Sequence, residues 1–271
     1  MTQTAKPIIL SIVNQKGGVG KTTTAINLSA ALAERGLHVL IIDLDPQGNA
    51  STGLGVPAAM RKKTSYDVII EDLPLAEAIM PTAISGLVIC PSNADLSSAD
   101  LELVSNAKRS FLLHDALRDP SVERLDLDFI LLDCPPSLSL LTINALVASH
   151  AVLVPLQAEF YALEGLSQLL LTVREVRQSA NPTLRIEGVL LTMVDARNRL
   201  AQQVENDARK TLGDLVFSTV IPRNVRLSEA PSYAQSILSY DSNSKGAEAY
   251  RNLAVEVLKR HPTADRTEQE Q

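Results

Sequence analysis

The stretch NQKGGVGKTTT, residues 14–24, decides the fold. It follows an apolar run rich in β-branched residues (8–14) and precedes a helical stretch (22–35). A strand, a glycine-rich turn and a helix in this order are the context of a phosphate-binding loop with the pattern G-x-x-x-x-G-K-[ST]. Gly20, Lys21 and Thr22 match the end of that pattern, whereas Gln15 stands at its first glycine and Lys16 is an additional lysine.

The residue types of this loop suit a bound polyphosphate. Gly17, Gly18 and Gly20 can adopt positive φ, so that backbone N–H groups surround phosphate oxygens. The N-terminus of the following helix adds about half a positive charge aimed at the same anion. Lys21 is expected to reach the β- and γ-phosphates, and the Thr22 hydroxyl to bind Mg²⁺. The predicted nucleotide-binding residues of the loop are Lys16, Gly17, Gly18, Val19, Gly20, Lys21, Thr22 and Thr23.

Acidic residues follow two other apolar runs. Asp43 and Asp45 lie in IIDLDPQGN, and Asp133 lies in FILLDCPPS. Ligands of open α/β sheets bind at the carboxyl ends of the strands, and a carboxylate there commonly holds hydrated Mg²⁺. Asp45 and Asp133 are therefore metal-site candidates. A turn-capping role stays open for Asp43 and, to a lesser degree, for Asp45 and Asp133.

Strand-like and helical segments alternate along the whole chain, which predicts an α/β fold with a doubly wound, mostly parallel sheet flanked by helices. The expected strands are 8–14, 38–43, 86–91, 128–133, 151–156, 185–194 and 215–222. The expected helices are 22–35, 99–117, 138–149, 161–179, 199–212 and 246–260. We expect one ATPase domain over residues 8–260, between a flexible N-terminus (1–7) and a polar, acidic tail (261–271).

Composition excludes several classes of protein. Two cysteines among 271 residues are too few for a disulfide framework, and the N-terminus has no apolar signal segment. Residues 134–158 carry no Asp, Glu, Lys or Arg, but their prolines and changing periodicity favour a buried helix and strand over a membrane span. The apolar face of 246–260 is expected to pack on the sheet.

Charge is distributed unevenly. The formal net charge is −6, yet residues 174–226 hold nine Arg or Lys and six Asp or Glu. The rest of the chain holds 16 basic and 25 acidic residues. This asymmetry suggests, without proving, a basic region within an acidic protein.

The additional lysine needs its own explanation. Lys21 already occupies the position over the bound phosphates, and the sequence offers no obvious internal arginine finger. A lysine at position 16 could point outward, across a two-fold axis, at nucleotide held by a second copy. We therefore predict that Lys16 acts in trans; a solvated lysine on the rim of the loop is the alternative.

The motif KGGVGKTT is the deviant Walker A signature. Together with DLDPQGN, LLDCPPS, QAEFYALEGL and IPRNVRLSEAPS, it resembles the ParA/Soj class of chromosome and plasmid partition ATPases over about residues 8–259. The resemblance implies a slow, Mg²⁺-dependent and partner-stimulated hydrolysis of ATP to ADP and phosphate, by a homodimer that forms when ATP binds.

The resemblance also assigns roles to residues. Lys16 would contact nucleotide across the dimer, Lys21 would hold the phosphates, and Asp45 would position the attacking water. Asp133 would be the Walker B acid, and it and Asp45 would hold Mg²⁺ through water, beside Thr22. The remaining assignments are Pro222 and Asn224 near adenine, Arg197 and Arg226 on DNA, and Arg223 as a weaker DNA-binding candidate.

The implied activity is a switch in the cytoplasm, on the nucleoid. The ATP-bound dimer would bind double-stranded DNA without sequence preference, and a ParB-type, centromere-binding partner would stimulate hydrolysis and release. Three alternatives share the loop: a MinD-like membrane-associated ATPase, a reductase of the nitrogenase iron-protein type, and an orphan relative that positions another cargo. The acidic tail argues against the first, and the setting of Cys90 and Cys134 argues against the second.

Overall fold

The computed structural model describes residues 6–159, 162–195 and 197–262. Most of the predicted N-terminal segment (1–7) and of the predicted tail (261–271) therefore lies outside the described residues. The strands are β1 Ile8–Ile12, β2 Val39–Asp43, β3 Met80–Pro81, β4 Leu87–Cys90, β5 Phe129–Asp133, β6 Ala151–Gln157 and β7 Arg185–Thr192. They form one sheet in the order β3-β4-β2-β5-β1-β6-β7, parallel except for the β3–β4 pair. The predicted fold class is confirmed.

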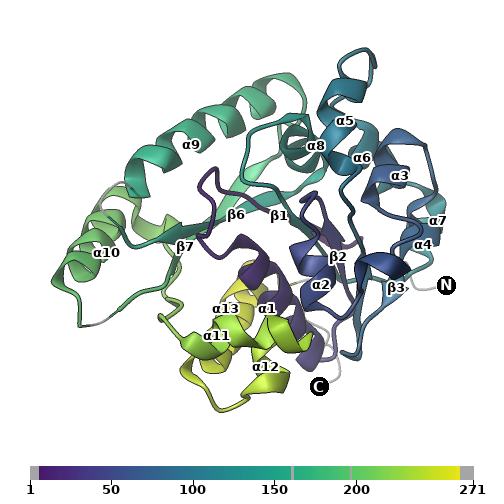
Figure 1. The fold of residues 1–271 in the computed structure, drawn as a ribbon. Helices are drawn as coiled ribbons and strands as arrows, with labels where there is room; N and C mark the ends of the chain where they lie inside the picture. The colour runs from purple at the N-terminus through teal and green to yellow at the C-terminus, as the bar shows by residue number, and fades with distance from the viewer. Residues whose placement is uncertain (1–5, 160–161, 196, 263–271) are drawn as a thin grey trace.

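Helices cover both faces of this sheet (Figure 1). The α-helices are α1 Lys21–Glu34, α2 Asn49–Gly53, α3 Ser65–Ile70, α4 Leu75–Ala78, α5 Leu96–Leu103, α6 Leu112–Ala116, α7 Pro120–Glu123, α8 Leu140–Ala148, α9 Ala162–Ser179, α10 Arg199–Leu212, α11 Val225–Glu229, α12 Ile237–Tyr240 and α13 Lys245–Arg260. Short 3₁₀ turns are η1 Ala58–Met60, η2 Gly213–Leu215 and η3 Ala230–Tyr233. One face packs against α1 and α13, and the other packs against α8 and α9.

Burial explains why the central strands read as continuous apolar runs. Every residue of β2 and β5 is buried, because helices cover both pleat faces. In α13, the face with Tyr250, Leu253 and Val257 is buried against the core, as expected. The uncharged segment forms the buried helix α8 and the buried strand β6. In the described part of the chain, no helix combines the length and apolar character that a membrane span requires.

The expected strand at 215–222 is wrong. This segment runs beside β7 and hydrogen-bonds to it through the N–H groups of Phe217 and Ile221, but the pairing amounts to isolated bridges rather than a continuous strand. The reason lies in α13, where the Glu256 carboxylate accepts the backbone N–H groups of Ser218 and Thr219. Those two amides therefore bond to a side chain rather than to a neighbouring strand.

The expected single helix at 99–117 is also wrong. It is split into α5 and α6, because the Asn106 side chain accepts the N–H of Lys108 in a local turn. The side-chain amide of Asn144, in α8, donates a hydrogen bond to the carbonyl oxygen of Arg109, at 2.6 Å. Side-chain bonds to the backbone thus replace the helical ones between the two pieces.

Candidate phosphate and metal site

Side-chain hydrogen bonds fix the loop between β1 and α1 at both of its ends. The Asn14 carboxamide donates to the carbonyl of Pro155 and accepts the N–H of Lys16. On the far side, the Thr192 hydroxyl donates to the carbonyl of Val19 at 2.8 Å. Asn14 and Thr192 are functional candidates that the loop pattern does not reveal, since their partners depend on the neighbouring strands β6 and β7.

Two glycines provide the turn into the helix. Gly18 has φ 75° and Gly20 has φ 89°, a region that other residues rarely adopt. Gly17, the remaining glycine of the loop, is not in the positive-φ region. Gly20 is the N-cap of α1, no side chain caps the helix, and its first turn has no acidic residue. The positive end of the α1 dipole is therefore left for an external anion.

The Lys21 side chain lies on the inside of the loop. Only 7% of this residue is exposed, and its Nζ donates to the carbonyl of Lys16 at 3.1 Å. Burial lowers the pKa of Lys21, while the charges of Asp133 and Asp45 act in the opposite direction. Lys21, at the start of α1, is therefore within electrostatic reach of the two predicted acidic residues that lie just after β2 and at the end of β5.

The two aspartates at neighbouring strand ends differ in environment. Asp43 and Asp133 are directly paired across β2 and β5, and both are fully buried. The Asp43 carboxylate accepts hydrogen bonds from the backbone and hydroxyl of Ser51 and from the backbone of Asp45. Asp43 thus fixes the turn after β2, the role that the sequence left open for it.

Neither carboxylate oxygen of Asp133 meets hydrogen-bond geometry with a described donor, although the Thr22 hydroxyl lies close enough to act on the carboxylate. Burial and the neighbouring charge of Asp43 raise its pKa well above the ordinary range, and the Thr22 hydroxyl and Lys21 act against that rise. A buried carboxylate with both oxygens unpartnered, beside a hydroxyl and an open helix N-terminus, fits a hydrated divalent cation carried with phosphates.

Asp45 is oriented by its surroundings but keeps one oxygen free for a ligand. Its Oδ1 accepts the N–H of Gln47 at 3.0 Å, and its backbone carbonyl accepts the Ser92 hydroxyl at 2.5 Å. Only 9% of the residue is exposed. Ser92 follows β4, so a residue outside every recognised motif holds the Asp45 backbone in place.

Lys16 lies on the outer rim of the loop, unlike Lys21. Its side chain is 54% exposed, and its Nζ lies 2.5 Å from Oε2 of Glu159, just beyond β6. Gln157 donates to the other oxygen of Glu159. Lys16 is therefore exposed on the rim, and its ion pair with Glu159 was not expected from the sequence.

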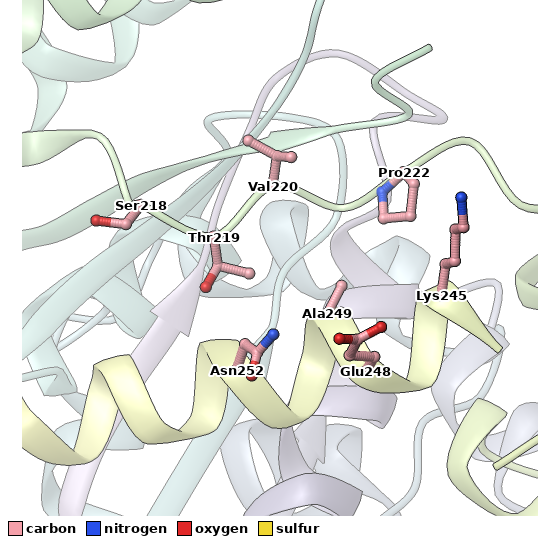
Figure 2. Close-up of a pocket in the computed structure, with 8 residues that line it drawn as sticks. All are labelled: Ser218, Thr219, Val220, Pro222, Lys245, Glu248, Ala249 and Asn252. Carbon is pink, nitrogen blue, oxygen red and sulfur yellow. The ribbon is translucent and has the colours of Figure 1, made fainter. Parts of the chain in front are cut away.

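Pro222 and Asn224 lie at the start of α11. Pro222 lines an open cavity of about 470 Å³ between residues 218–222 and α13, with Lys245 and Asn252 (Figure 2). No residue of the phosphate loop lines this cavity. The Asn224 carboxamide accepts the N–H of Arg226 and caps α11. A backbone bond from Arg223 to Val194 connects this segment to the end of β7, beside the loop.

The three predicted DNA-binding arginines are exposed. Val194 pairs with Pro222 in an isolated bridge. Arg197 and Arg223 follow these two residues in the chain, and each lies just before a helix, α10 and α11 respectively. Arg226, on α11, is engaged by two carboxylates, described below.

The comparisons with known proteins agree with this geometry. A family profile described as an AAA domain matches residues 7–186. The chain is 52% identical over 257 residues to the chromosome partitioning protein ParA of Caulobacter vibrioides, covering 94% of this chain and 96% of that protein. The chain belongs to the ParA/Soj family.

Other matches place the ParA/Soj chain in a wider structural group. It is 51% identical to the sporulation initiation inhibitor protein Soj of Bacillus subtilis, over 92% of this chain and 97% of that protein. Among solved structures, cobyrinic acid a,c-diamide synthase of Mycobacterium smegmatis, with bound ATP analogue and magnesium, matches with a TM-score of 0.81. That match has 36% identity and covers 95% of this chain and 96% of the other.

We predict that the unpartnered carboxylate of Asp133 lowers the thermal stability of the nucleotide-free protein. The folded-state pKa of Asp133 is raised, so the stability it contributes is full below the unfolded-state pKa and lost as pH rises through the folded-state pKa. We expect Asp133→Asn, without nucleotide or metal near pH 8, to raise the unfolding temperature by about 2–10 °C. The reason is that burying a neutral amide costs about 1–3 kcal/mol less than burying the unpaired carboxylate.

Thermal unfolding followed by circular dichroism measures this gain, which should shrink as the pH falls. The matched control is Asp43→Ala, which removes an equally buried carboxylate but strands its Ser51 donors and should lower the unfolding temperature. An Asp133→Asn protein that unfolds at or below the wild-type temperature would show that the carboxylate is not an unpaired charge.

Proposed function

We propose that this chain is an ATP-dependent dimerising ATPase switch that binds DNA without sequence preference and drives chromosome or plasmid partition with a ParB-type partner. The observation that carries the proposal is the difference in exposure between the two lysines of the loop. Lys21 is buried over the phosphate position, whereas Lys16 is exposed on the rim. Membership of the ParA/Soj family supports the cellular role, at the nucleoid in the cytoplasm.

In this proposal, residues 16–23 surround the triphosphate. The open N-terminus of α1 and the buried ammonium of Lys21 bind the phosphate oxygens. Thr22 and, through water, Asp133 and Asp45 hold Mg²⁺, which supplies positive charge to the phosphates when it is bound. Asp45 orients the attacking water, and Pro222 with Asn224 contacts the adenine.

The rim position of Lys16 gives it a role that Lys21 does not have. Its ion pair with Glu159 is half-exposed, and such pairs contribute little stability, so the ammonium can exchange Glu159 for another anion. In a two-fold dimer, that anion is the triphosphate bound to the other copy. The closed dimer would then hold each nucleotide with cations from both subunits.

Arg197, Arg223 and Arg226 form the proposed DNA interface, doubled by the two-fold axis. Contacts of this kind go to phosphates, so affinity depends steeply on salt and little on base sequence. Dimerisation doubles the number of arginines that one DNA segment can meet, which explains why binding would require ATP. The ParB-type partner would stimulate hydrolysis and so release the DNA.

The test combines light scattering after gel filtration with retention on random-sequence DNA, using ADP and a non-hydrolysable ATP analogue. We expect a dimer and DNA retention with the analogue only, and no retention on anionic lipid vesicles. Arg197→Ala and Arg226→Ala should still dimerise but bind DNA about tenfold or more weakly at low salt, since each dimer loses two phosphate contacts. Arg251→Ala, which removes an arginine paired with Glu34, is the matched control.

Three results would count against the proposal. A monomer with the analogue removes the dimer, and retention on vesicles in place of DNA favours a MinD-like protein. Unchanged DNA affinity in both arginine variants removes the interface.

A further inference from the structure

The Arg226 side chain is held between two carboxylates that come from different elements. Its Nη1 lies 2.9 Å from Oε2 of Glu229, at the end of α11. Its Nε lies 3.7 Å from Oδ2 of Asp241, directly after α12. The Tyr240 hydroxyl donates to the same Glu229 oxygen at 3.2 Å, which fixes the carboxylate in this position. Figure 1 shows α11 and α12 next to each other.

This cluster has the wrong net charge for a phosphate. One guanidinium faces two carboxylates, so the local sum is negative although the residue expected to bind DNA is a cation. Arg197 and Arg223 differ in this respect, because neither forms an ion pair within the described residues. Of the three arginines, Arg226 alone must therefore exchange protein carboxylates for phosphate oxygens.

The exchange is feasible because the cluster is open to solvent. The Arg226 side chain is 55% exposed, and those of Glu229 and Asp241 are 40% and 38% exposed. Ion pairs of this exposure are weak, and a polyanion with a dense row of phosphates can displace them. The displaced carboxylates would nevertheless stay close to the DNA backbone and repel it.

We propose that Glu229 and Asp241 restrain the DNA interface, by neutralising Arg226 and by repelling the phosphates that replace them. Both effects lower the affinity of the ATP-bound dimer for DNA. This inference rests on the proposed DNA binding, and names two residues that determine its strength. Both act through charge and neither contacts a base.

The test uses the full-length chain with a non-hydrolysable ATP analogue and a fluorescent random-sequence duplex, titrated at several salt concentrations. Glu229→Gln and Asp241→Asn should each tighten binding about three- to tenfold at low salt. The gain in affinity should shrink as the salt concentration rises, because salt screens the repulsion between the carboxylate and the DNA phosphates. Adding Arg226→Ala to either variant should cancel the gain.

Glu34→Gln is the matched control. It changes the net charge by the same amount and breaks the Arg251–Glu34 pair, 2.7 Å long, and it should change affinity by less than about twofold. Tyr240→Phe removes the hydrogen bond to Glu229 but keeps both carboxylate charges. Its affinity therefore shows the effect of losing the hydrogen bond alone. Unfolding temperatures of all variants establish that the fold is kept.

The possible outcomes separate this inference from the proposed function. If Glu229→Gln and Asp241→Asn bind no more tightly than Glu34→Gln, or bind more weakly, the carboxylates do not restrain the interface. If Arg226→Ala still loses affinity in that experiment, the DNA interface itself stands. If Arg226→Ala binds normally, Arg226 is not part of the DNA interface and this inference falls, whether or not Arg197→Ala loses affinity.

Discussion

A Lys16→Ala protein is expected to bind ATP but to remain a monomer and lose hydrolysis by about 100-fold or more, since the loss resembles removal of an arginine finger. Binding should survive because Lys21 and the N-terminus of α1 are untouched. Folding should survive because Lys16 is half-exposed and its ion pair is of the weak surface kind. Light scattering with a non-hydrolysable ATP analogue and a phosphate-release assay measure the two losses.

The chain offers a matched control for this variant. Lys63 forms an ion pair with Glu77 at 2.6 Å, and the two side chains are 50% and 51% exposed. Lys63→Ala therefore removes the same kind of pair away from the loop, and should dimerise and turn over normally. Normal turnover by Lys16→Ala, at a rate independent of protein concentration, would contradict a role for Lys16 in trans.

An Asp45→Ala protein is expected to do the opposite: to retain ATP and accumulate as a dimer on DNA. Removing a residue that orients the attacking water should lower hydrolysis by about 100- to 10,000-fold. The nucleotide should stay bound, because the phosphate loop and Asp133 are unchanged. Nucleotide content after gel filtration and the lifetime of the DNA complex measure this trapped state.

Asp45→Asn accompanies that experiment, because the amide can still accept the N–H of Gln47 and so preserve the local turn. Both variants should be trapped. If the alanine variant loses ATP while the asparagine variant keeps it, Asp45 has a structural role in the loop. An ATP-free monomer from both would contradict the role in positioning water.

Local sequence predicts the elements that carry the candidate phosphate site well, because these elements are short and contiguous. The loop, the uncapped helix start and the acidic ends of β2 and β5 all follow from residues next to one another in the chain. The different contacts of Asp43 and Asp133 could not be predicted in this way. Both end an apolar run, but Ser51 satisfies one carboxylate and no described residue satisfies the other.

The errors have a common origin in contacts between distant segments. The Glu256 carboxylate accepts hydrogen bonds from the backbone N–H groups of Ser218 and Thr219. The Asn144 side chain donates to the carbonyl of Arg109. In both places a side chain far along the chain replaces a regular backbone bond. The ion-pair partner of Lys16 was missed for the same reason, since Glu159 lies 143 residues away in the chain.

The most direct measurement mixes two variants that are each inactive. Lys16→Ala is expected to hold ATP but to offer no lysine to its partner, whereas Lys21→Ala keeps Lys16 but cannot hold the phosphates. If Lys16 acts in trans, their mixed dimer contains one complete site, and phosphate release should appear on mixing and rise with the concentration of either protein. If mixed dimers form and release no phosphate, each lysine acts on the nucleotide of its own subunit and the shared site does not exist.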